Sequence, residues 1–144
     1  MTGPYKSVII RLVSCGMVPF MQLFGLYVIT HGHYGPGGGF QGGVILGVSI
    51  IIQRLALGKQ ISYRKFPPQL SPVLGGIGML IYVLSGLVPV FMGGSFLDYS
   101  YLPIPWVSGA PLRALGTFIV ECGIGLSVFG TMVLVYDSLS GENW

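Results

Sequence analysis

Apolar residues dominate four separate stretches of the chain, at residues 8–30, 40–57, 73–92 and 114–136. Each stretch is near the ~20 residues that a helix needs to cross the ~30 Å hydrocarbon core of a membrane. The connections between them, at residues 31–39, 58–72 and 93–113, are richer in glycine, proline and polar residues. In the second connection, Ser71 followed by Pro72 predicts an N-cap and the start of the third helix. The pattern predicts an all-α, multi-pass membrane protein with four transmembrane helices in a single domain, residues 1–144.

The composition supports a membrane protein and excludes two other classes. Only 8% of the 144 residues are charged, against roughly 25% in a typical soluble protein. So few charges cannot cover the surface of a soluble globule, and a disordered chain would need low hydrophobicity and high net charge. Both cysteines, Cys15 and Cys122, lie in apolar stretches and are expected to be small core residues.

The seven cations predict how the chain is oriented in the membrane. With four spans, both termini and the middle connection share one side, which holds Lys6, Arg11, Arg54, Lys59, Arg64 and Lys65, whereas the other side holds Arg113. Because lysine and arginine favour the cytoplasmic side of a membrane, both termini are expected in the cytoplasm. The membrane that the chain spans is expected to be the plasma membrane. Arg11 and Arg54, near the ends of their helices, are expected to extend to the surface water. No basic patch interleaved with aromatics indicates nucleic-acid binding.

The outer connection, residues 93–113, is rich in aromatic residues and proline. It contains Phe96, Tyr99, Tyr101 and Trp106. Aromatic rings favour the interface between lipid and water. The connection is therefore expected to lie on the membrane surface as a cap anchored by these rings.

Glu121 and His33 are the candidate proton-relay residues. Glu121 lies seven positions into the fourth apolar stretch, and an ionisable residue at such depth is a candidate functional group. A protonated Glu121 that only bridges two helices is the alternative. His33 lies at the membrane boundary, where a histidine can relay protons. His31 and His33 together supply at most two metal ligands, so a closed metal site is not expected.

Glycines concentrate between residues 32 and 47. Gly39, Gly43 and Gly47 recur every fourth residue, and Gly123, Ser127 and Thr131 make a similar stripe in the last helix. Small residues at this spacing let helices pack closely in lipid. The spacing of Gly37, Gly39 and Gly42 matches a dinucleotide fingerprint, but the required preceding strand is missing, which argues against nucleotide binding.

The run from His33 to Gly43 resembles the glycine-rich signature of MrpB/MnhB-type subunits of Mrp-type cation/proton antiporters. The family pattern H-x-x-P-G-G-G-F-x-G-G is matched by His33, Pro36, Gly37, Gly38, Gly39, Phe40, Gly42 and Gly43. The resemblance implies a compact broken turn between the first two helices, packed against neighbouring subunits near an ion path. Phe40 would wedge into a partner helix.

The resemblance also implies an accessory, non-redox subunit of a sodium/proton-translocating module. Homologous subunits occur in archaeal membrane-bound hydrogenase and sulfane-reductase complexes, so the partners implied are other Mrp-type membrane subunits and, in such complexes, redox subunits. No enzymatic activity and no cofactor are expected of the chain itself, since it has no cysteine cluster for an iron–sulfur site. Two alternatives stay open, a purely structural scaffold in the same assembly and a small homo-oligomeric transporter.

Overall fold

Four long helices and two short ones make up the computed structural model, which describes residues 7–32 and 37–141. The elements are α1 (Val8–His31), α2 (Gly39–Leu57), α3 (Lys59–Lys65), α4 (Leu70–Phe91), the 3-10 turn η1 (Tyr99–Tyr101) and α5 (Ala110–Leu139). In the described part of the chain, α1, α2, α4 and α5 are long and apolar enough to cross a membrane, and no strand is present. The predicted fold class, all-α with four transmembrane helices, is confirmed.

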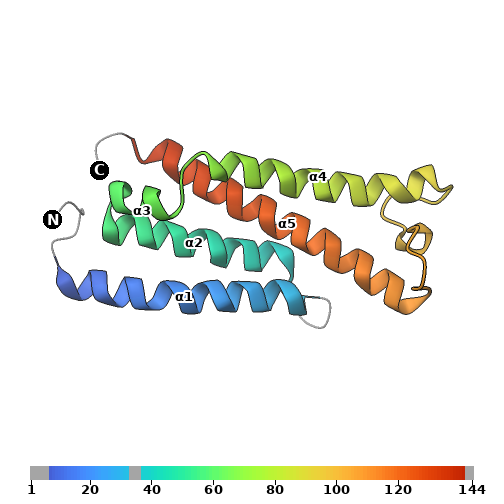
Figure 1. Ribbon diagram of the computed structural model, residues 1–144, viewed down its shortest axis with the longest axis horizontal. Helices are drawn as coiled ribbons and strands as arrows, with labels where there is room; N and C mark the ends of the chain where they lie inside the picture. Colours follow the sequence, from blue (N-terminus) through green and yellow to red (C-terminus); the bar gives the residue numbers. More distant parts are fainter. Residues whose placement is uncertain (1–6, 33–36, 142–144) are drawn as a thin grey trace.

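The helices form two hairpins that meet along α2 and α5. The helix pairs α1–α2 and α4–α5 pack against each other, and α2 packs against α5 to join the two hairpins. The α1–α2 hairpin is displaced along the bundle, so that the end of α1 and the start of α2 lie beside the middle of α5 (Figure 1). The start of α1, all of α3 and the end of α5 lie at the opposite end. This displacement places the helix ends that flank the glycine-rich connection within the length of the bundle and not at its tip.

The region between α2 and α4 differs from its prediction in two respects. Residues 58–72 were expected to be a connection without a helix, but they contain α3. A helix of only 7 residues is too short to show a clear hydrophobic periodicity in the sequence. The predicted N-cap at Ser71 is wrong, because the helix already begins at Leu70. The amides of Leu70 and Ser71 donate to the carbonyls of Pro67 and Pro68, at 3.1 and 3.3 Å, which starts the turn earlier. Pro72 is tolerated there because first-turn amides have no helical partner.

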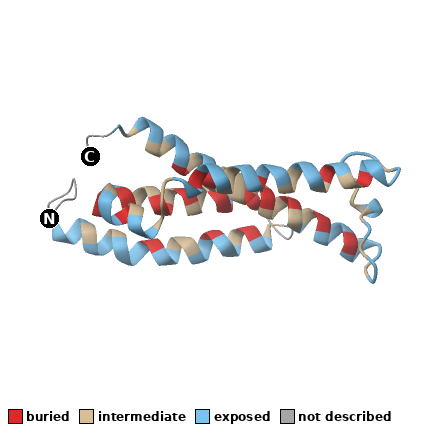
Figure 2. Ribbon diagram, turned by 45° about the horizontal axis from the view of Figure 1, so that its top comes forward, coloured by how far each residue is buried: buried red, intermediate tan, exposed pale blue. Residues whose placement is uncertain are grey.

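Small residues allow the helices to approach one another closely. A methyl group added at Gly43 would lie 3.0 Å from the Cα atom of Gly125, and one added at Gly123 would lie 3.0 Å from the carbonyl oxygen of Gly78. Buried residues follow these facing sides, whereas the outer faces of α1 and α4 are largely exposed (Figure 2). Such apolar outer faces suit contact with lipid or with other membrane subunits.

The aromatic connection between α4 and α5 packs largely on the chain's own helices. Three of its rings cover glycines: Phe96 covers Gly86, Tyr99 covers Gly116 and Tyr101 covers Gly94. Only Trp106 is almost completely exposed, at 99%. Phe96 and Tyr101 are nevertheless 48% and 47% exposed, so each of these rings has one side against a glycine and another side open. The surface cap with four aromatic anchors stays a prediction.

Candidate functional site

The site is built where the glycine-rich connection meets the side chain of Glu121 on α5. Helix α1 ends at His31 with Gly32 as its C-cap, and α2 begins at Gly39 with Gly38 as its N-cap. A methyl group added at Gly32 would lie 2.6 Å from Oε2 of Glu121, and one added at Gly38 would lie 3.0 Å from Oε1. The carboxyl group therefore lies against both ends of the connection, and side chains at these two positions would displace it.

Glycine is required at this point for two separate reasons. The first is backbone conformation, since Gly37 has φ +149° and Gly38 has φ +83°, values that side chains disfavour. The second is space, because a Cβ atom at Gly39 would overlap the main-chain carbonyl of Glu121. The main chains of α2 and α5 thus touch directly at the level of the carboxyl group.

The first turn of α2 lies beside the carboxyl group of Glu121. The amides of a helix's first turn have no partner within the helix, and the helix dipole adds a partial positive charge there. The N-cap residue is Gly38, which has no side chain that could accept a hydrogen bond from these amides. A carboxylate beside this N-terminus is stabilised in the same way as anions bound at helix N-termini elsewhere.

Glu121 lies farther from the start of its helix than the sequence indicated. Because α5 begins at Ala110 and not at residue 114, Glu121 is eleven residues into a helix of 30. At 1.5 Å per residue it lies about 16 Å from the start of α5. The earlier start of α5 corrects the sequence-based depth of seven residues, and it puts Glu121 in the middle third of the helix.

The phenol of Tyr99 lies near Glu121. Burial raises the pKa of the Tyr99 phenol, and the nearby Tyr82 and Glu121 raise it further. The Tyr99 ring covers Gly116, which is five residues before Glu121 on α5. Tyr99 therefore links the aromatic connection to the side of the bundle that carries the carboxyl group.

The structure places the other predicted residues at several different points. His33 and Pro36 lie outside the described residues. Phe40, at the start of α2, is 62% exposed. Gly42 contacts α1 at Gly25 and Ile29, whereas the remaining packing residues contact α5 or α4: Gly43 lies against Gly125, Gly47 against Met132, and both Gly123 and Ser127 against Gly78. Gly39 and Gly43 thus face this chain's own α5, where the sequence had suggested neighbouring subunits.

Sequence reasoning missed a buried ion pair at the opposite end of the α2–α5 contact. Arg54 of α2 is 1% exposed and its guanidinium pairs with the carboxylate of Asp137 on α5. Its Nη2 atom also donates to the carbonyl of Phe66 at 3.4 Å, and its Cζ atom lies 4.8 Å from the centre of the Tyr63 ring. The expectation that Arg54 extends to surface water is therefore wrong, because α3 and α5 together enclose it and supply its partners.

The described residues contain no group of three or more His, Cys, Asp or Glu side chains that could hold a metal ion. The site brings together one carboxyl group, a helix N-terminus and the nearby phenol of Tyr99. Such a set can bind and release a proton or attract a cation.

Comparison with known proteins places the chain among antiporter subunits. A family described as "Domain related to MnhB subunit of Na+/H+ antiporter" matches residues 9–134. The antiporter subunit named mnhB2 of Staphylococcus haemolyticus is 35% identical over 138 residues, which cover 94% of this chain and 96% of that protein. The subunit of the same name from Staphylococcus aureus strain MRSA252 is 34% identical over 138 residues, which again cover 94% of this chain and 96% of that protein.

A solved structure shares the fold over nearly the whole chain. It belongs to the membrane-bound sulfane sulfur reductase, an archaeal respiratory membrane complex, and it superposes with a TM-score of 0.72 at 26% identity. The match covers 96% of this chain but 60% of that longer chain. The family match, the two relatives and this fold agree with the glycine-rich motif. The chain belongs to the family of the MnhB subunit of Na+/H+ antiporters.

Proposed function

We propose that the chain acts as an accessory, non-redox subunit of a multisubunit sodium/proton-translocating module in the plasma membrane, and that Glu121 exchanges protons there. Family membership and the four apolar helices support the accessory role. The partners are other Mrp-type membrane subunits, with redox subunits added where the module belongs to a hydrogenase or sulfane-reductase complex. The positive charge at the α3 end supports a cytoplasmic position for both termini.

One observation carries the role of Glu121, the placement of its carboxyl group against a break between two helices in the middle of the bundle. Backbone without helical hydrogen bonds is tolerated at membrane depth only when it is buried in protein or lines a water-filled cavity. The N-terminus of α2 offers the carboxyl group a favourable neighbour when it is ionised, and proton exchange requires such a neighbour because the anion would otherwise be costly at this position.

His33 is proposed as the second relay residue. It follows Gly32 directly in the chain, and Gly32 lies against both carboxyl oxygens of Glu121. A histidine changes its charge between about pH 5 and 8, which suits transfer to or from a carboxyl group. A His33→Ala variant that retains full coupled transport would restrict the relay to Glu121.

Substitution of Glu121 distinguishes proton exchange from a purely structural role. Glu121→Gln keeps the size and much of the hydrogen bonding but cannot ionise. The proposal expects coupled transport to be lost in Glu121→Gln and partly kept in Glu121→Asp. A structural bridge expects the reverse order, because aspartate is shorter by one methylene. The measurement is sodium-dependent proton movement in membrane vesicles with equal amounts of assembled complex.

Asp98→Asn is the matched control for loss of a carboxylate outside the helices. Asp98 caps η1 by accepting from the amide of Ser100 at 3.1 Å, far along the chain from the glycine-rich connection. Coupled sodium/proton transport by the complex with Asp98→Asn is expected to match transport by the unmodified complex. Near-normal coupling in Glu121→Gln would remove Glu121 from the proton path and leave the scaffold role as the better description.

The chain purified alone is expected to transport no ions. Both α1 and α4 leave wide apolar faces exposed, which suit contact with partner helices and lipid. The relay residues named above would then be one segment of a path that partner subunits complete. The test is reconstitution of the single chain in liposomes with a sodium gradient. Sodium-dependent proton flux there would instead support a small homo-oligomeric transporter.

A further inference from the structure

The α1–α2 hairpin is tightly closed near its connection and open toward its other end. Near the connection, a methyl group added at Gly25 would lie 3.0 Å from Cγ of Leu46 and 3.2 Å from the carbonyl oxygen of Gly42. Toward the α3 end, a groove of about 440 Å³ separates the two helices. It is lined by Ile10, Ser14 and Met17 of α1 and by Ile52, Leu55 and Ala56 of α2.

The lining of this groove suits a hydrocarbon chain. Five of its six side chains are apolar, and Ser14 contributes the only hydroxyl group. Ile10 and Met17 are 43% and 54% exposed, so the groove opens sideways at membrane depth and is not filled by the chain's own residues. An apolar group that fills a groove of this kind gains dispersion contacts with its walls.

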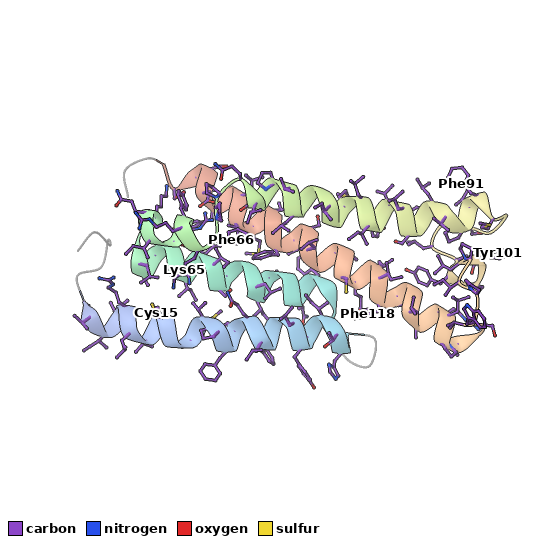
Figure 3. All side chains as sticks on the ribbon, in the orientation of Figure 1. Cys15, Lys65, Phe66, Phe91, Tyr101 and Phe118 are labelled. Atoms are coloured by element: carbon purple, nitrogen blue, oxygen red, sulfur yellow. The ribbon has the colours of Figure 1, made fainter. Side chains whose placement is uncertain are left out.

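Positive charge gathers at the same end of the bundle. Arg11 follows Ile10 on α1, and Arg64 and Lys65 lie in the last turn of α3. Figure 3 places Lys65 at the same end of the bundle as Cys15, the neighbour of Ser14. Among the residues that the structure describes, none of these three cations pairs with a carboxylate, in contrast to Arg54, which pairs with Asp137.

We propose that the groove binds one acyl chain of an anionic phospholipid, whose phosphate is held by Arg11 and the basic end of α3. Basic residues between transmembrane helices at the cytoplasmic side favour anionic headgroups, and guanidinium binds phosphate oxygens through paired hydrogen bonds. A transmembrane helix of a partner subunit is the rival occupant. It would fill the apolar groove, but it would leave unmatched both Arg11, which adjoins the lining residue Ile10, and the cations at the same end of the bundle on α3.

The test measures lipid retention and does not involve transport, so it is independent of the role of Glu121. The full chain is purified in detergent and mixed with phosphatidylglycerol, phosphatidylcholine or inorganic phosphate, and bound molecules are counted by native mass spectrometry. We expect phosphatidylglycerol to be retained more tightly than phosphatidylcholine, and excess inorganic phosphate not to displace it. Since each basic residue contributes about 1 kcal/mol near anionic lipid, Arg11→Gln should weaken retention about fivefold.

Matched variants separate the groove from the rest of the surface. Ser14→Phe fills the groove from α1 and should abolish retention, with Ile10→Trp as a second filling variant. Cys15→Phe adds the same ring to the neighbouring position outside the lining. Cys15 is exposed on α1, so its prediction as a core residue is wrong. Arg113→Gln removes the cation at the other end of the bundle. Both controls should retain phosphatidylglycerol normally, and circular dichroism confirms that each variant is helical.

Three results would overturn the proposal. The first is equal retention of phosphatidylglycerol and phosphatidylcholine, because the cations would then play no part. The second is unchanged phosphatidylglycerol retention in both groove-filling variants, because the lipid would then bind elsewhere. The third is loss of retention when the same measurement uses the assembled complex, because a partner helix would then occupy the groove.

Discussion

A Gly39→Ala substitution is expected to lower the free energy of unfolding by about 3 kcal/mol. The added Cβ atom would overlap the main-chain carbonyl of Glu121, and neither main chain can move aside as the tip of a side chain can. Overpacking of a well-packed core costs ~1–3 kcal/mol, and this backbone contact belongs at the upper end. The measurement is unfolding of the full chain in mixed micelles as the denaturing detergent is increased.

The matched control is Gly76→Ala on α4, where an added Cβ atom meets nothing within 4 Å. Because alanine favours the helix over glycine by roughly 0.5–1 kcal/mol, this variant should be as stable as the original chain or slightly more so. Leucine at Gly39 or Gly43 should also reduce incorporation into the complex, judged on native gels, because both glycines position α2 on α5. Equal stability of Gly39→Ala and Gly76→Ala would contradict the close α2–α5 contact.

Removal of one partner from the Arg54–Asp137 pair is the second substitution with a large expected effect. Arg54→Leu leaves the Asp137 carboxylate, of which about one tenth is exposed, without its cation. Breaking a buried ion pair in this way costs ~3–5 kcal/mol, whereas replacement of both partners by apolar residues is often neutral. Arg54→Leu combined with Asp137→Leu should therefore recover most of the lost stability in the same unfolding measurement.

An exposed cation at the α3 end of the bundle provides the control for the unfolding measurement on Arg54. Arg64→Leu, in the last turn of α3, removes an exposed charge and should change stability by no more than about 0.5 kcal/mol. If the losses from Arg54→Leu and Asp137→Leu simply add in the double variant, the two side chains are not coupled, and the ion pair does not hold α2 to α5.

The sequence by itself determined the number, type and approximate limits of the membrane helices. In lipid every backbone polar group needs a partner within the protein, so an apolar stretch of about 20 residues has essentially one solution, a helix. The predicted spans at residues 8–30 and 40–57 differ from α1 and α2 by one residue. The motif from His33 to Gly43 also identified the family, because its residues are close together in the chain.

Only the tertiary structure decided which helix faces pair and at which level. Membrane helices are apolar on nearly all sides, so the hydrophobic pattern that orients a soluble helix is weak here. The stripe of Gly39, Gly43 and Gly47 indicated close packing, but nothing in it specified this chain's α5 as the neighbour. The displacement of the two hairpins follows from contacts between residues far apart in the sequence.

The same limit explains the individual corrections. Glu121 was identified as a candidate from its own chemistry, but its position against Gly32 and Gly38 depends on the α2–α5 register. Arg54 seemed free to reach surface water because its partner, Asp137, is 83 residues away in the chain. Local sequence determines helices through short-range hydrogen bonding and hydropathy, whereas the partners of a charged side chain are set by the packing of whole helices.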